Sequence, residues 1–244
     1  MNDVWFPEMP HDVHLLLKHG DITQLETIAW GSNYTFCAGL ECGSLKGLGI
    51  YKPRRGERPL WDFPDGTLFR REYAAYLASQ AIGWDFIPPT VIRDGPHGVG
   101  SMQLYIESEP PRSMRELQDP SDLELARVAA FDFVTNNADR KAGHVLRDGA
   151  GKLWGIDHGL CFNVVPKVRT VLLHFCGEPV PPPVIAELTE FRADEFRLAG
   201  LCALLDSLLE CEEIEVFLKR IDTLLSRRVF PGVDRYRGVP WPPF

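Results

Sequence analysis

The polar residues best suited to chemistry gather near the middle of the chain, among short apolar runs. Residues 145–146 and 153–156 are apolar, and the glycine-rich turn between them predicts a β-hairpin. Asp139 and His144 precede the first strand of this hairpin, and Asp157 follows the second. Because a hairpin brings its outer ends together, we expect these side chains to converge. Burying two carboxylates and an imidazole costs free energy unless they are paired or hold a metal, so the pattern predicts a metal–nucleotide site.

Composition limits the classes of protein to consider. The chain has 244 residues, 45% hydrophobic and 25% charged, which is typical of a globular protein with one large domain or two lobes. Its net charge of −8 argues against a general nucleic-acid or membrane-surface binder. No apolar run reaches the roughly 18 residues of a membrane span, and no signal peptide is recognisable. The cysteines form no C-x-x-C pair. We therefore expect a cytoplasmic protein with free thiols.

A glycine-containing turn separates the first two predicted strands. Residues 23–30 and 34–40 have the composition of strands, and Gly31, Ser32 and Asn33 lie between them. A turn of small residues lets backbone N–H groups approach phosphate oxygens, so this turn is a candidate phosphate loop. Most glycine-containing hairpin turns bind nothing, and an ordinary turn is the alternative.

Lys52 ends a third predicted strand, residues 49–52, and is followed by a proline that cannot continue a sheet. Together with Arg54 and Arg55 it forms a basic cluster in an acidic chain. The cluster suggests an anionic ligand. A surface patch paired with Glu57 is the simpler alternative.

Residues 67–81 predict a helix, because apolar residues recur at helical spacing after a plausible N-cap at Thr67. Glu72 falls near the middle of this helix. Taken alone, it is expected to be solvated. The alternative is that Glu72 points at Lys52 across the sheet and orients that lysine.

A break in the middle of the chain predicts two lobes. Strands are expected at residues 89–93 and 101–107, and residues 107–111 form a proline-broken connector. We interpret the connector as a hinge between a β-rich N-terminal lobe, residues 1–108, and a helical C-terminal lobe, residues 109–244. Helical periodicity recurs in the second lobe, at residues 122–135 and, as three helices, across residues 184–228.

This layout and two motifs resemble the protein-kinase-like superfold, specifically its phosphatidylinositol 3-/4-kinase-related branch. Those kinases carry D-R-x-x-x-N and, one hairpin later, I-D-x-G; residues 139–144, DRKAGH, and 156–159, IDHG, correspond to these motifs here. The whole chain also resembles a small actinobacterial family related to those kinases, with the blocks YKPRRGERPLWDFP, NNADRK and WGIDHG. The resemblance implies an α+β, two-lobed protein-kinase-like fold.

The resemblance also implies roles for individual residues. Lys52 would pair with ATP phosphates, and Glu72 would hold Lys52. Asp139 would orient or deprotonate the attacking hydroxyl, and Asp157 would hold Mg²⁺. The other implied ATP contacts are Gly31, Ser32 and Asn33 over the phosphates and the strand end near Glu107 beside the adenine.

Two residues depart from the family pattern. His144 stands where those kinases have Asn, and Mg²⁺ prefers oxygen to imidazole nitrogen. His144 would therefore coordinate a softer ion such as Mn²⁺, or act through water, or leave the metal to Asp157 alone. His158 replaces a Phe, and it either packs in the core or contacts Asp139 or phosphate.

The resemblance implies an ATP- and metal-dependent phosphotransferase that moves the γ-phosphoryl group to a hydroxyl of a protein or small molecule. Residues 162–170 contribute only Lys167 and Arg169 as cations, so we do not expect a lipid substrate. Three alternatives remain open: an AMP transferase on the same fold, a nucleotide-binding pseudokinase with a regulatory role, and a metal-dependent phosphohydrolase.

Overall fold

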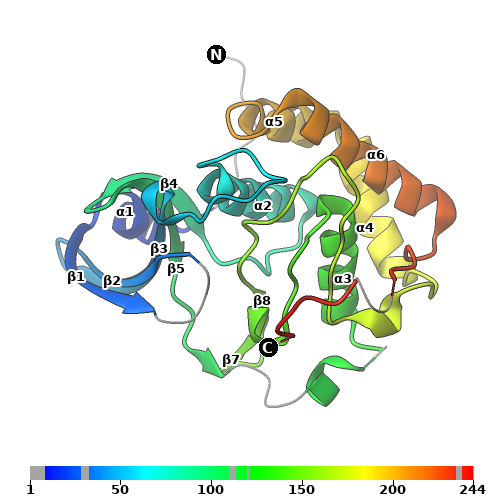
Figure 1. Ribbon diagram of the computed structural model, residues 1–244, viewed down its shortest axis with the longest axis horizontal. Coiled ribbons are helices and arrows are strands. Elements are labelled where there is room, and N and C mark those ends of the chain that lie inside the picture. Colours follow the sequence, from blue (N-terminus) through cyan, green and yellow to red (C-terminus); the bar gives the residue numbers. More distant parts are fainter. Residues whose placement is uncertain (1–8, 29–32, 110–113, 120, 235–237, 244) are drawn as a thin grey trace.

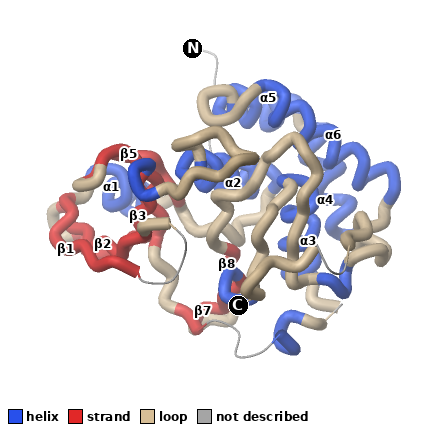
Figure 2. Tube along the Cα trace, viewed as in Figure 1, coloured by secondary structure: helices blue, strands red, loops and turns tan. Residues whose placement is uncertain are grey.

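The computed structural model describes residues 9–28, 33–109, 114–119, 121–234 and 238–243. A β-sheet with helix α1 (His11–His19) occupies one side of the molecule, and a cluster of helices occupies the other (Figures 1 and 2). Helix α2 (Leu68–Ile82) lies between them. The α+β character predicted from the sequence is confirmed. Within these described ranges, no helix is long and apolar enough to cross a membrane.

The larger sheet is antiparallel throughout, with the strand order β1-β2-β3-β5-β4. Its strands are β1 (Asp21–Ile28), β2 (Thr35–Cys42), β3 (Leu45–Pro53), β4 (Thr90–Gly95) and β5 (Gly98–Leu104). Helix α1 (His11–His19) packs on the sheet through Leu16 and Leu17, which share a buried cluster with Tyr51 and Met102. Strand β3 pairs with β2 on one side and with β5 on the other, and these pairings fix the place where Lys52 leaves the sheet.

Strand β5, the last of this sheet in chain order, differs from the prediction. We expected it at residues 101–107, but β5 begins at Gly98 and ends at Leu104. Gly98 pairs directly with Gly95 and has a φ of 93°, a conformation that glycine adopts without steric cost, so the turn is tighter than predicted. Glu107 lies beyond the strand in an irregular, exposed segment.

Helix α2 (Leu68–Ile82) closely matches the predicted helix and ends at Gly83, whose φ is 88°. Nearly all of its residues are buried, because it is packed between the sheet and the helical part of the molecule. Glu72 is only 3% exposed. The expectation of a solvated Glu72 is therefore wrong, and the alternative is correct, because Glu72 accepts a hydrogen bond from Lys52.

The remaining elements form the helical part and a small sheet. The helices are α3 (Leu123–Thr135), α4 (Pro182–Ala193), α5 (Glu195–Leu205) and α6 (Cys211–Arg227), and the short 3-10 helices are η1 (Arg54–Gly56), η2 (Met114–Leu117), η3 (Ala142–His144) and η4 (Leu173–Phe175). The small sheet has the order β6-β7-β8, formed by Ser108–Glu109, Val145–Asp148 and Leu153–Gly155. Strands β7 and β8 are the predicted hairpin.

The predicted hinge is only partly visible. Its residues Ser108–Glu109 form β6, which pairs with β7, and residues 110–113 lie outside the described part of the chain. The division into lobes at residues 108 and 109 stays a prediction. The helical part has its own core, in which the rings of Phe162 and Phe217 meet edge to face with centroids 5.5 Å apart.

Candidate active site

Lys52 lies at the centre of the candidate active site. It is the last residue but one of β3, and its Nζ donates hydrogen bonds to Glu72 of α2 and, at 2.8 Å, to Oδ1 of Asp157. Asp157 follows the end of β8, as predicted. The structure therefore brings together three predicted site residues from separate elements.

Glu72 also holds the backbone next to Asp157. Its Oε2 accepts a hydrogen bond of 3.0 Å from the backbone N–H of His158. Asp157 has a φ of 60°, a left-handed conformation that a non-glycine residue keeps only when its surroundings impose it. Glu72 thus fixes both the ammonium of Lys52 and the backbone that orients the carboxylate of Asp157.

Opposite charges keep Lys52 and Asp157 ionised. Burial alone would lower the pKa of Lys52, but the carboxylates of Asp157 and Glu72 outweigh it, and the pKa lies above its ordinary value. Burial would raise the pKa of Asp157, yet Lys52 reverses this and holds that pKa well below its usual range. For Glu72, burial outweighs the opposing charge of Lys52 and raises the pKa. The site therefore presents a permanent cation beside a permanent anion.

Arg140 explains why the ends of the hairpin converge. Its buried guanidinium donates to the backbone oxygens of Ile156, at 3.0 Å, and His144, at 3.3 Å. The backbone N–H of Ile156 in turn donates to the oxygen of His144, at 2.9 Å. Asp132 of α3 balances the charge of Arg140 through two bonds of 2.9 Å. Arg140 belongs to the motif at residues 139–144, but no role for it was predicted from the sequence.

His144 contacts Asp157 in a defined tautomer. Its Nδ1 accepts a long hydrogen bond, 3.4 Å, from the backbone N–H of Lys141, so the proton of the neutral ring lies on Nε2. Nε2 is 3.3 Å from Oδ2 of Asp157. Burial lowers the pKa of His144 to about 4, although the charge of Asp157 opposes this shift. His144 is therefore a neutral donor toward Asp157 at neutral pH.

Asp139 lies close enough to Asp157 for the charges of the two carboxylates to interact. Burial raises the pKa of its carboxyl; Lys141 opposes this shift, and the negative charge of Asp157 adds to it. The ammonium of Lys141 is 3.2 Å from Oδ2 of Asp139. Lys141 was not predicted from the sequence, although a cation two residues after the candidate base was a usable signal.

The donor atoms around Asp157 suit an ion that prefers oxygen ligands. Within the described ranges, no group of three His, Cys, Asp or Glu side chains is already arranged around a metal position. The carboxylates of Asp157 and Asp139 match the ligand preference of Mg²⁺ and Mn²⁺, which at nucleotide sites take further oxygens from phosphate and water. The residues present therefore fit a metal–nucleotide complex better than a metal held by protein alone. Metal binding by Asp157 and His144 stays a prediction.

His158 is a packing residue. It is fully buried, and its ring meets Phe131 edge to face with centroids 5.7 Å apart. Its Nε2 is 2.6 Å from Nη2 of Arg140, which can only donate, so Nε2 accepts. Burial, reinforced by Arg140, lowers the pKa of His158 and keeps the ring neutral. Of the two roles considered for His158, the core role is the one that the structure shows.

The remaining predicted nucleotide contacts are less defined. Gly31 and Ser32 lie outside the described residues. Oδ1 of Asn33 accepts a 2.7 Å hydrogen bond from the backbone N–H of Arg58, which ties the end of the turn to the segment that follows Lys52. The exposed Glu107 is not in the site described by these contacts, and its place beside an adenine stays a prediction.

Arg71 joins α2 to the helical part of the molecule. Its buried guanidinium donates to the backbone oxygen of Cys161, at 2.8 Å, and to Oε1 of Glu213 in α6, at 2.6 Å. Arg71 directly precedes Glu72, so the helix is fixed from both sides at the position where it contacts Lys52. This pair was not predicted from the sequence, because α2 and α6 are far apart in the chain.

The chain matches a known protein over nearly its whole length. No model of a known protein family matches the chain. Protein Rv2133c of Mycobacterium tuberculosis is 38% identical to it, over 96% of each protein. The chain belongs to the Rv2133c family. Phosphatidylinositol 4-kinase gamma 4 of rice, Oryza sativa subsp. japonica, is 31% identical, over 37% of this chain and 20% of that kinase.

Solved kinase structures share the fold of this Rv2133c relative. The Golgi casein kinase with Mn/ADP bound covers 88% of the chain with a TM-score of 0.60 and 14% identity, matched over 74% of its own length. Hydra Fam20 with sugar covers 88% with a TM-score of 0.63 and 16% identity, over 87% of its own length. The Helicobacter pylori kinase CtkA covers 87% with a TM-score of 0.52 and 12% identity, over 94% of its own length. These likenesses confirm the predicted protein-kinase-like fold.

Proposed function

We propose that this protein is an ATP- and divalent-metal-dependent phosphotransferase that moves the γ-phosphoryl group of ATP to a hydroxyl of a protein or small molecule. The observation that carries the proposal is Lys52, whose ammonium is bonded to both Glu72 and Asp157. A cation fixed by one carboxylate and placed beside another suits phosphoryl transfer, because the reaction depends mainly on positioning and on neutralising charge.

Each residue of the site has a defined task in this proposal. Lys52 binds phosphate oxygens, and Glu72 keeps its ammonium in place. Asp157 holds Mg²⁺ or Mn²⁺, which when bound neutralises charge on the phosphates. Asp139 orients the acceptor hydroxyl and takes its proton, a task for which the raised pKa of its carboxyl is favourable. Lys141, next to Asp139, adds positive charge where the transferred group would lie.

We infer that His144 affects metal binding indirectly, by orienting Asp157. With its proton on Nε2, the ring donates toward Oδ2 and restricts the orientation of that carboxylate. Neighbours that orient a metal ligand in this way tune metal affinity without touching the ion. We therefore favour Asp157 as the direct ligand and His144 as its positioning residue.

The comparisons support the proposal at the level of the fold. Matched structures are those of kinases, and one of them holds Mn and ADP. The partial match to a phosphatidylinositol 4-kinase covers 37% of this chain, and it supports kinase chemistry without specifying the acceptor.

Labelled ATP tests the proposal. The full-length chain is incubated with Mg²⁺ or Mn²⁺ and ATP labelled at either the γ- or the α-phosphate, and label is followed in protein, in inorganic phosphate and in small-molecule products. We expect metal-dependent release or transfer of the γ-label, with the α-label remaining in ADP. Transfer of the α-label to protein would instead establish an AMP transferase, and retention of both labels in ATP with every metal would favour the pseudokinase.

A further inference from the structure

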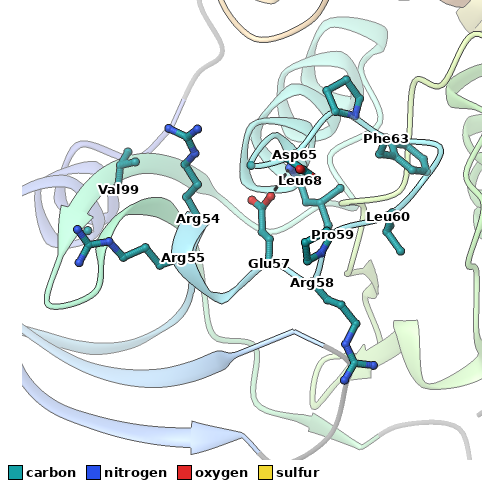
Figure 3. Close-up of a pocket in the computed structure, with 13 residues that line it drawn as sticks. Arg54, Arg55, Glu57, Arg58, Pro59, Leu60, Phe63, Asp65, Leu68 and Val99 are labelled. Carbon is teal, nitrogen blue, oxygen red and sulfur yellow. Dashed lines mark hydrogen bonds between the residues drawn. The ribbon is translucent and has the colours of Figure 1, made fainter.

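A pocket of about 510 Å³ lies beside the candidate active site, at the start of helix α2. It is bordered by η1, by the segment that leads into α2 and by the turn between β4 and β5 (Figure 3). Lys52, Glu72 and Asp157 are not among the described residues that line it. The pocket is therefore separate from the cluster that we assign to phosphoryl transfer.

Two arginines lie on one side of this pocket. Arg54 and Arg55 extend from η1 on the side of Val99, and Arg58 points away from them (Figure 3). The side chains of Arg54 and Arg55 are exposed. In the described part of the chain, no carboxylate forms an ion pair with either guanidinium. Neither Arg54 nor Arg55 has a described carboxylate at ion-pair distance, although the charge of Arg54 acts on Glu57, so positive charge is left available for a ligand.

The carboxylate within the pocket offsets only part of this charge. Glu57 lies between the arginines and the opposite wall (Figure 3), and each of its oxygens accepts a hydrogen bond from the start of α2. Oε2 accepts from the N–H of Leu68 at 3.1 Å, and Oε1 accepts from the N–H of Phe69 at 2.8 Å. The partial positive charge of the helix start offsets Glu57. Asp65, the other acid of the lining, is exposed to solvent.

The wall opposite the arginines is apolar. Leu60 and Phe63 lie there (Figure 3), and Pro59 and Pro64 also line the pocket. A pocket with cations on one side and carbon surface on the other suits a ligand with an anionic group on a small organic body. Its volume is in the range of small-molecule sites.

We propose that this pocket binds a small phosphate monoester. Its phosphate group is held by the guanidinium groups of Arg54 and Arg55, and its organic part lies against Leu60 and Phe63. Arginine binds phosphate through parallel, charge-assisted hydrogen bonds, and two arginines match the double charge of a monoester better than the single charge of a carboxylate. The sequence cluster that suggested an anionic ligand thus divides between two sites, with Lys52 in one and both arginines in the other.

Calorimetric titration of the full-length chain with phenyl phosphate tests this assignment. The titration is run at constant ionic strength in the presence of saturating ADP and Mg²⁺, so that phosphate binding at the nucleotide site is suppressed. We expect phenyl phosphate to bind, and inorganic phosphate to bind more weakly because it lacks the organic part. Arg54→Gln combined with Arg55→Gln should weaken binding roughly tenfold or more, because charge-assisted hydrogen bonds are lost.

The matched control is Lys219→Gln combined with Arg227→Gln, which removes the same charge from exposed positions of α6. It should leave the affinity for phenyl phosphate unchanged. Equal affinities of the two double variants would overturn the proposal, as would the absence of wild-type binding at millimolar phenyl phosphate. Equal affinities for phenyl and inorganic phosphate would overturn the role of the apolar wall. The readout needs no turnover, so an inactive enzyme would leave this test intact.

Discussion

Nζ of Lys52 donates a hydrogen bond of 2.8 Å to Oδ1 of Asp157, a residue 105 positions later in the chain. This contact joins the end of β3 to the residue that follows the β7–β8 hairpin. Glu72 of α2 accepts from the same ammonium and from the backbone N–H beside Asp157. The position of α2 therefore controls both partners of the contact.

Replacing Lys52 by Met should remove phosphoryl transfer while leaving the protein folded. The variant loses the cation that would bind the phosphates, and we expect kcat/KM for ATP to fall by about a hundredfold or more. Activity is compared at a temperature below the melting point of the variant, because buried Glu72 loses its partner. Lys46→Met on the same strand is the control, since Lys46 pairs with Glu41 at the surface. A variant as active as this control would rule out the role of Lys52.

Replacing Glu213 by Gln should destabilise the protein. The change leaves the buried Arg71 without its carboxylate, and breaking a buried ion pair in this way costs about 3 kcal/mol or more. The exposed pair of Arg192 and Asp222 provides the control, and Asp222→Asn should cost less than about 1 kcal/mol. Urea unfolding of both variants gives the comparison. Equal losses would mean that the buried pair does not hold α2.

Stability of the metal-free protein should fall as the pH drops from about 6.5 to about 4. Burial lowers the pKa of His144 to about 4 in the folded state, whereas the ordinary value is 6.5. Between these values the unfolded chain binds the additional proton, so acid favours unfolding by at most about 3 kcal/mol from this residue. His158 is shifted in the same direction, so the informative quantity is the difference between wild type and His144→Gln.

That difference is measured by urea unfolding at pH 7 and pH 4.5 in the presence of a chelator. The free energy of unfolding of His144→Gln should decrease less between the two pH values than that of wild type. An identical decrease in both proteins would show that His144 keeps an ordinary pKa in the folded state.

Replacing His144 by Asn should change the metal preference of the enzyme. The amide oxygen of Asn is a suitable ligand for Mg²⁺, whereas the imidazole of His144 presents its Nε2 proton toward Asp157. We expect the ratio of activity with Mg²⁺ to activity with Mn²⁺ to rise in His144→Asn. An unchanged ratio would show that His144 does not affect which metal the enzyme prefers.

The sequence predicted the parts of the site that depend on local structure. The apolar runs of β7 and β8 with a glycine-rich turn between them predicted the hairpin, and the hairpin places His144 next to Asp157. The helical stripe predicted α2, and a family resemblance pointed Glu72 at Lys52. The roles of these residues in nucleotide and metal binding remain predictions.

The missed features depend on tertiary contacts. Arg71 and Glu213 are 142 positions apart, and neither residue signals its burial, because Arg and Glu are usually exposed. The neutral state of His144 likewise follows from burial and from the N–H of Lys141. The end of β5 was misplaced because the tight turn at Gly98 shortens the hairpin.

The most direct test of the proposed function is a thermal-shift titration with ATP, with and without Mg²⁺ or Mn²⁺. A ligand that binds only the folded state raises the melting temperature with its concentration. We expect a metal-dependent rise in wild type that is lost in Asp157→Ala and kept in Asp85→Ala, an exposed carboxylate paired with Lys152. No shift in wild type with any metal, or an equal shift in all three proteins, would contradict a metal–nucleotide site built on Lys52 and Asp157.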